Sequence, residues 1–254
     1  MLDTIATLLG ATTFWWVAAA VVCGGLMRGF VGFGGAMVMV PSIALGYDVI
    51  TAVPVAALAG IPSMVQLLPT AVRHCERALV LPIVVAVVLF APLGTVALVA
   101  LDAEVLKLLM GSLVLAMTGL LAAGWQFGQN VPLPILFVAG AAGGLVQGVA
   151  GIGGPPVVAV ALSRAGSANQ QRANVIGVMT GVSASALAPL WYFELITLDV
   201  FALALLLMPC YSAGTWLGTA RFAGGGHRWF RPAALGLLAL IGIITMATAI
   251  SGYV

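Results

Sequence analysis

The stretch GLMRGFVGFGG, from Gly25 to Gly35, recurs as GLVQGVAGIGG from Gly144 to Gly154. The two copies share six of eleven residues, and five of those six are glycine. In each copy three glycines fall within four residues, and each costs a helix interior about 1 kcal/mol relative to alanine. The sequence therefore predicts that a helix stops in each copy and that a new one begins near Ala36 and Pro155.

The composition indicates that these motifs lie in a membrane. Of 254 residues, 63% are hydrophobic and 6% are charged, whereas a soluble domain carries about 25% charged residues. Apolar runs long enough to span a bilayer as helix recur along the whole chain. The expected fold is therefore an all-α polytopic membrane protein. The first apolar run has no basic n-region and no A-x-A cleavage site, so we expect a retained helix.

Ten apolar segments are expected between polar, glycine or proline breaks. They cover residues 5–27, 33–46, 52–70, 79–100, 105–124, 132–149, 153–163, 173–192, 200–219 and 232–251. The second and seventh are too short to cross a core of ~30 Å as straight helix. We expect these two to be half-helices or re-entrant arms.

The charged residues support this alternation of segments. Six acidic residues lie at one set of segment ends: Asp3, Asp48, Asp102, Glu104, Glu194 and Asp199. Seven of the nine basic residues lie in three loops at the other ends: Arg73, Arg77, Arg164, Arg172, Arg221, Arg228 and Arg231. The positive-inside rule makes the basic side cytoplasmic and places both termini outside.

The repeat divides the chain into two halves, residues 1–126 and 127–254, with five segments each. PLGTVAL (Pro92–Leu98) also aligns with SAGTWLG (Ser212–Gly218), at a similar offset. An odd number of segments turns the second half upside down relative to the first. The sequence therefore predicts two inverted-topology repeats in one membrane domain, a pattern typical of secondary transporters.

The glycine motifs allow two interpretations. Gly25-x3-Gly29 and Gly140-x3-Gly144-x3-Gly148 are small-x3-small patterns that let helices approach closely. Alternatively, a helix that begins at membrane depth directs free amides and the positive end of its dipole into a cavity, which suits an anion. Two such breaks related by inversion would converge near the midplane, where transporter sites lie.

Arg28 is the one basic residue that belongs to no segment flank. An arginine within a segment costs several kcal/mol unless it faces a cavity or a partner. One alternative is that Arg28 extends to the cytoplasmic interface; the other is that its guanidinium pairs with an oxyanion. Its repeat counterpart, Gln147, donates hydrogen bonds without adding charge.

Polar residues on the third and eighth segments, Ser63, Gln66, Asn174 and Ser183, are candidate lining residues, although such side chains often bond to their own helix or a neighbour. The full set of candidate substrate-binding residues is Arg28, Gly32, Phe33, Gly34, Gly35, Ser63, Gln66, Gln147, Gly151, Ile152, Gly153, Gly154, Asn174 and Ser183.

Several functions lack the residues they need. Cys23, Cys75 and Cys210 have no metal-binding spacing, so we expect neither a metal site nor a cofactor. No acid lies in mid-segment, which disfavours carboxylate-based proton coupling. HExxH and Gly-Lys-Ser/Thr motifs are absent from the sequence, and we expect neither an enzyme nor a partner nucleic acid.

The chain resembles the TauE/SafE permease family over nearly its whole length. The resemblance rests on Gly32-Phe-Gly34-Gly35 followed by Val40-Pro41, and on Gly148-x2-Gly151-x-Gly153-Gly154. It implies a multi-pass protein of the bacterial inner membrane that exports small sulfur-containing anions such as sulfite, sulfoacetate or sulfolactate, although some members are proposed to import. The sequence departs from the family at Ala36 and Pro155, where a glycine is common, and at Val160, which replaces a proline.

Expected partners are the small anionic substrate, the lipid bilayer and a second copy of the chain in a homodimer. The alternatives left open are a transporter of another small anion, of a cation or of a neutral solute, and import in place of export.

Overall fold

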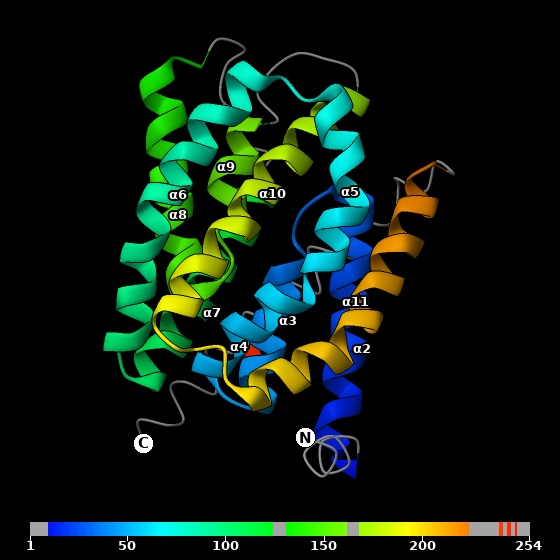
Figure 1. Ribbon diagram of the computed structural model, residues 1–254, viewed down its shortest axis with the longest axis vertical. Coiled ribbons are helices and arrows are strands. Elements are labelled where there is room, and N and C mark those ends of the chain that lie inside the picture. The colour runs from blue at the N-terminus through cyan, green and yellow to red at the C-terminus, as the bar shows by residue number, and fades with distance from the viewer. Residues whose placement is uncertain are drawn as a thin grey trace.

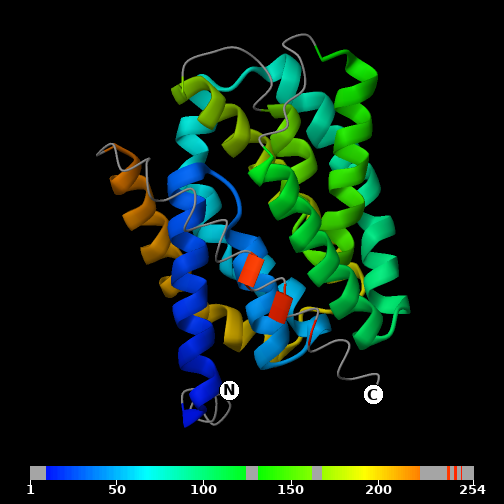
Figure 2. The same cartoon turned by 180° about the vertical axis from the view of Figure 1, so that it is seen from behind.

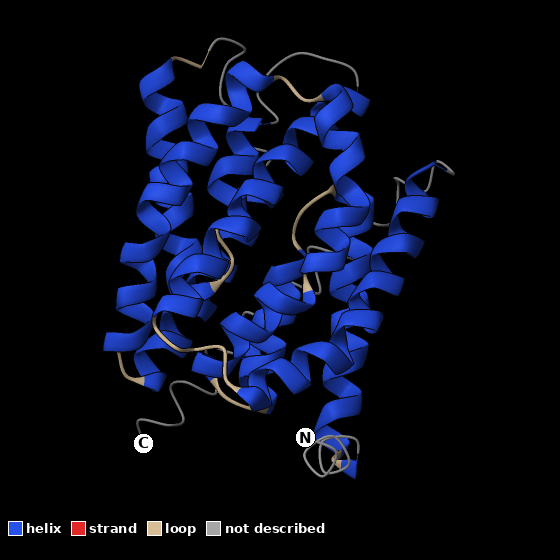
Figure 3. Ribbon diagram, in the orientation of Figure 1, coloured by secondary structure: helices blue, strands red, loops and turns tan. Residues whose placement is uncertain are grey.

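The computed structural model describes residues 10–123, 131–161 and 168–223, together with residues 239–240, 243–244 and 247. Every regular element in this part of the chain is an α-helix (Figures 1 and 3). The helices are α2 (Thr12–Val31), α3 (Gly35–Gly46), α4 (Val49–Ala59), α5 (Ile61–His74), α6 (Arg77–Ala100), α7 (Ala103–Ala122), α8 (Leu133–Ala150), α9 (Gly154–Ala161), α10 (Ala168–Tyr192) and α11 (Leu198–Ala223).

Five described helices are long and apolar enough to cross a membrane: α2, α6, α8, α10 and α11. The pair α4 and α5 passes the same test together but is bent by 46°. The third predicted segment, 52–70, is thus two helices that meet at Gly60, and Pro62 occupies the first turn of α5, where proline is tolerated. The tenth predicted segment, 232–251, lies largely outside the described residues. The chain is a multi-pass membrane protein.

The two short segments fold back along the helices that precede them. A Cβ at Gly24 of α2 would lie 2.7 Å from the carbonyl oxygen of Gly35, where α3 begins. At the other end of α3, a Cβ at Gly46 would lie 2.9 Å from the side chain of Thr13. At a rise of about 1.5 Å per residue, α3 is roughly 18 Å long. It is too short to cross the hydrocarbon core.

The pair α8 and α9 repeats this arrangement. A Cβ at Gly143 of α8 would lie 3.0 Å from the carbonyl oxygen of Gly153 and 2.7 Å from the side chain of Val157. At the spacing of the repeat, Gly143 corresponds to Gly24 and Val157 corresponds to Val38. The side chain of Val38 likewise lies 3.5 Å from a Cβ built at Gly24. Both glycine motifs therefore fold as a long helix followed by a short antiparallel one.

Two pairs of long helices join segments that are distant in the chain. Helix α11 packs along α2, and α6 packs along α8, on opposite sides of the molecule (Figures 1 and 2). A Cβ at Gly29 would contact the carbonyl oxygen of Thr215 on α11, and one at Gly148 would contact that of Ala91 on α6. The leading glycines of both motifs are thus helix-packing residues, as the small-x3-small interpretation predicts.

Large apolar side chains cover the outside of these paired helices. Exposed examples on α6 are Leu81, Val85, Leu89 and Leu93, and Trp216 on α11 is 66% exposed. Buried apolar side chains fill one cluster around α2, α3, α4 and α11 and a second around α6, α8, α9 and α10. An exterior this apolar is suited to contact with lipid.

Candidate functional site

Three glycines in the two breaks have backbone conformations that other residues rarely adopt. Gly32 caps α2 with φ 92°, and Gly151 caps α8 with φ 67°. Each donates its amide to the carbonyl four residues earlier, that of Arg28 over 2.9 Å and that of Gln147 over 2.8 Å. Gly34, which precedes α3, has φ 87°. Positive φ values favour glycine because a Cβ clashes with the backbone there, so both long helices end at a glycine.

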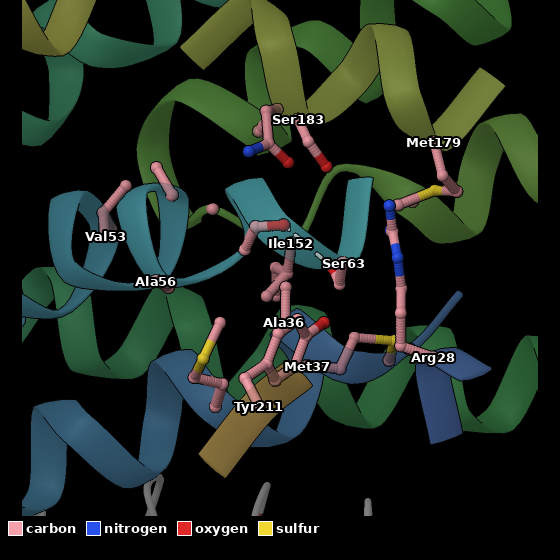
Figure 4. Close-up of a pocket in the computed structure, with 17 residues that line it drawn as sticks. Arg28, Ala36, Met37, Val53, Ala56, Ser63, Ile152, Met179, Ser183 and Tyr211 are labelled. Atoms are coloured by element: carbon pink, nitrogen blue, oxygen red, sulfur yellow. Dashed lines mark hydrogen bonds between the residues drawn. The ribbon is translucent and has the colours of Figure 1, made fainter. Parts of the chain in front are cut away.

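Both breaks line one pocket, drawn in Figure 4. Its cavity volume is about 40 Å³, which is room for roughly three water molecules. Residues from α2, α3, α4, α5, α8, α9, α10 and α11 converge on it. They are Arg28, Gly34, Ala36, Met37, Met39, Val53, Ala56, Ala57, Gly60, Ser63, Gln147, Gly151, Ile152, Gly154, Met179, Ser183 and Tyr211.

Arg28 supplies the positive charge of the pocket. Its side chain is 4% exposed and extends from α2 so that the guanidinium lies beside Met179 (Figure 4). The structure therefore places the Arg28 side chain among the residues that line the pocket. Its Nε is buried, with no hydrogen-bond partner among the described residues. None of the lining residues is acidic, so the pocket itself provides no counter-charge.

Gln147 holds the second break together. The amide of Gly153 donates a hydrogen bond to Oε1 of Gln147 over 3.0 Å, and the Gln147 side chain is 6% exposed. Because the oxygen is used in this way, the NH2 group is the part of Gln147 that can donate to a ligand. Arg28 and Gln147 occupy equivalent places in the repeat and line the same pocket from opposite halves.

Hydroxyl groups add further polar atoms to the lining. Ser63 is completely buried and donates to the carbonyl of Gly60 over 2.8 Å. Tyr211 of α11 is 3% exposed and lines the pocket, and its hydroxyl shares a hydrogen bond with Ser63. Ser183 of α10 lines the pocket from a third side (Figure 4). Tyr211 was not among the candidates from the sequence. The feature that could have identified it is that it is the one tyrosine within the apolar segment 200–219.

Six of the sequence candidates do not line this pocket. Gln66 is exposed on α5. Asn174 is 2% exposed, and its Oδ1 accepts a hydrogen bond from the amide of Glu76 over 2.7 Å, so it ties α10 to the start of α6. The remaining four belong to the breaks but are not lining residues: Gly32, Phe33, Gly35 and Gly153.

The lining residues together have the chemistry of an anion site. They offer one guanidinium, one amide, hydroxyl groups and the first backbone amides of α3, and these groups are hydrogen-bond donors. No cluster of three or more histidine, cysteine or carboxylate side chains suited to a metal ion occurs among the described residues.

The profile of the family described as Sulfite exporter TauE/SafE matches residues 17–245. That range contains both glycine motifs and all the residues that line the pocket. No curated protein and no solved structure matches the chain. Because the match covers most of the sequence, the chain belongs to the sulfite exporter TauE/SafE family, a family of membrane transporters.

Proposed function

We propose that this protein is a permease that exports small sulfur-containing oxyanions of the sulfite type, and that the anion binds in the pocket between the two glycine breaks. The observation that carries the proposal is Arg28, a buried guanidinium whose Nε has no partner among the described residues. A buried donor left unsatisfied costs about 1–3 kcal/mol, and more when the group is charged. A bound anion would offset that cost, and its oxygens match the forked guanidinium.

The start of α3 would assist Arg28. Gly34 and Ala36 line the pocket at the N-terminus of this helix, where free amides and the helix dipole favour negative charge. The equivalent turn of α9 contains Pro155 and Pro156, which have no amide hydrogen. The first half would therefore bind the anion more strongly than the second.

The inverted repeat gives this pocket a route to both sides of the membrane. Reciprocal packing, with α11 on α2 and α6 on α8, supports two halves, residues 1–126 and 127–254, related by inversion. Rocking of one half against the other around the shared pocket would expose the anion first to one side and then to the other. We place the protein in the bacterial inner membrane, as a homodimer.

Export follows from the electrical gradient. A negative interior drives each negative charge outward with about 2.3 kcal/mol per 100 mV. No acidic residue lines the pocket, so proton coupling through a carboxylate has no group there to use. The membrane potential alone would move the anion out of the cell.

Proteoliposomes that contain Arg28→Gln test this function against Arg221→Gln, which removes the same charge from an exposed position at the end of α11. We expect sulfite flux to fall at least about tenfold in Arg28→Gln, the loss for 1.4 kcal/mol of binding, and to stay at the wild-type level in Arg221→Gln. Arg28→Lys should keep part of the flux, because it retains the charge but not the fork. Wild-type sulfite flux in Arg28→Gln, with the variant correctly folded, would refute the proposal.

A further inference from the structure

The pocket contains a single full positive charge. Arg28 is the only charged residue among those that line it. Arg172 is the basic residue of α10, the helix that carries Met179. Its guanidinium donates a hydrogen bond to the carbonyl of Gly29 over 2.7 Å, and it does not line the pocket. The helix dipole at the start of α3 adds a partial charge of about +0.5. The pocket therefore compensates one negative charge well and a second one poorly.

The other lining residues strengthen the preference for an anion with a single negative charge. Three methionines, Met37, Met39 and Met179, and the apolar side chains Val53 and Ile152 form much of the wall. Such a wall cannot replace the water that an ion leaves behind. The hydration free energy of an ion increases with the square of its charge, so a dianion would lose about four times as much as a monoanion of the same size.

We infer that the species that crosses this pocket is a monoanion: hydrogensulfite in place of the sulfite dianion, and a compact sulfonate in place of sulfate. This inference rests on the function proposed above and specifies its substrate.

A pH dependence of transport would then come from the substrate. Sulfite exchanges with hydrogensulfite near neutral pH, whereas a sulfonate keeps one charge. The titratable lining residues are Arg28 from α2 and Tyr211 from α11, and the other helices contribute only non-titratable lining residues. Histidine, the side chain that ordinarily changes charge near neutral pH, is absent from the lining.

The test uses the wild-type chain in sodium-free proteoliposomes in which potassium and valinomycin set the potential. Labelled sulfite, methanesulfonate and sulfate are compared at equal pH on both sides, and leak is subtracted with protein-free liposomes. At equilibrium we expect sulfite and methanesulfonate each to accumulate about tenfold for every ~59 mV, the response of one charge. Sulfate flux should be at least about tenfold below methanesulfonate flux, a difference of 1.4 kcal/mol.

Initial rates at subsaturating substrate give a second readout. Between about pH 8 and about pH 6, where no lining residue ordinarily titrates, the sulfite rate should rise in proportion to its hydrogensulfite fraction. The methanesulfonate rate should not change. These measurements need no variant, so they do not depend on whether a substitution in the pocket folds.

The outcomes separate the two proposals. Accumulation of sulfite by about a hundredfold per ~59 mV, the response of two charges, would overturn the monoanion inference and leave the proposed function standing. Sulfate flux equal to methanesulfonate flux, or accumulation that ignores the potential, would overturn it as well. Flux of all three anions that is no greater than in protein-free liposomes would overturn the proposed function itself.

Discussion

The amide of Gly153 donates a hydrogen bond to Oε1 of Gln147 across the second glycine break, while Arg28, at the equivalent place beside the first break, leaves its Nε without a partner among the described residues. The two halves therefore use one position in two ways. Gln147 stabilises the backbone of its own break, and Arg28 offers a charge to the pocket. The asymmetry lets stability and transport be changed separately.

Gln147→Glu should abolish transport while sparing the fold. A carboxylate oxygen can still accept the Gly153 amide, but the new negative charge would compete with the anion for Arg28. We expect methanesulfonate flux to fall at least about tenfold, since like charges disfavour binding by more than 1.4 kcal/mol at this range. The melting temperature in detergent should remain close to that of the wild type.

Gln147→Ala is the matched comparison. It removes the acceptor of the Gly153 amide and should lower stability by about 1–3 kcal/mol, the cost of a buried donor left unsatisfied. Its residual flux should exceed that of Gln147→Glu. The reverse order of flux would contradict the charge argument.

Tyr211→Phe should weaken substrate binding with little effect on folding. The ring stays in place, but the pocket hydroxyl that shares a hydrogen bond with Ser63 is lost. A hydrogen bond to a charged group contributes about 1.5–3 kcal/mol, so we expect KM for transport to rise at least roughly tenfold. Tyr192→Phe removes a hydroxyl from a residue that is 76% exposed and serves as the control. Equal KM values for the two variants would show that Tyr211 does not contact the anion.

Gly29→Ala and Gly148→Ala should destabilise the two reciprocal helix pairs. A Cβ at either position would press on the backbone of the partner helix, at Thr215 or at Ala91. Overpacking of this kind costs about 1–3 kcal/mol, which thermal unfolding in detergent can measure. Gly119→Ala on α7 is the control, since a Cβ there has nothing within 4 Å. A loss of stability as large in the control would contradict this account.

Gly151→Ala should destabilise the break itself. Its φ of 67° costs a residue with a Cβ about 1–2 kcal/mol, and the new Cβ would lie 3.2 Å from Val40. In Gly177→Ala, on α10, the nearest atoms lie at 3.4 Å, an ordinary contact, so this variant should be neutral or stabilising. Hydrogen exchange at Ile152 and Gly153 would show whether the destabilisation is local.

Much of the architecture was predictable because a bilayer imposes simple rules. Helix bounds agreed with the apolar runs within a few residues for most segments, since a helix is the conformation that satisfies every backbone group within the run. The two short segments were recognisable from their length. The glycine motifs marked the breaks, because an αL cap such as Gly32 or Gly151 excludes other residues.

Other features depended on neighbours that are distant in the chain. The division of segment 52–70 into two helices at Gly60 was not predicted, since one apolar run does not reveal how its two parts pack. Gln66 and Asn174 have the polar side chains expected of lining residues. Gln66 is nevertheless exposed, and Asn174 accepts a hydrogen bond from the amide of Glu76. The face of a helix that a side chain occupies decides this, and that face depends on how the neighbouring helices pack against it.

The sequence by itself determined the all-helical membrane fold, most of the helices and the family, because composition, segment length and glycine spacing act locally. Only the tertiary structure decided that Arg28 is buried in a pocket, that Tyr211 also lines this pocket, and that both breaks line one cavity. These features arise where α2, α8 and α11 converge. Helix α2 is more than a hundred residues from the other two in the chain, and contacts between such distant segments set the burial and the partners of each side chain.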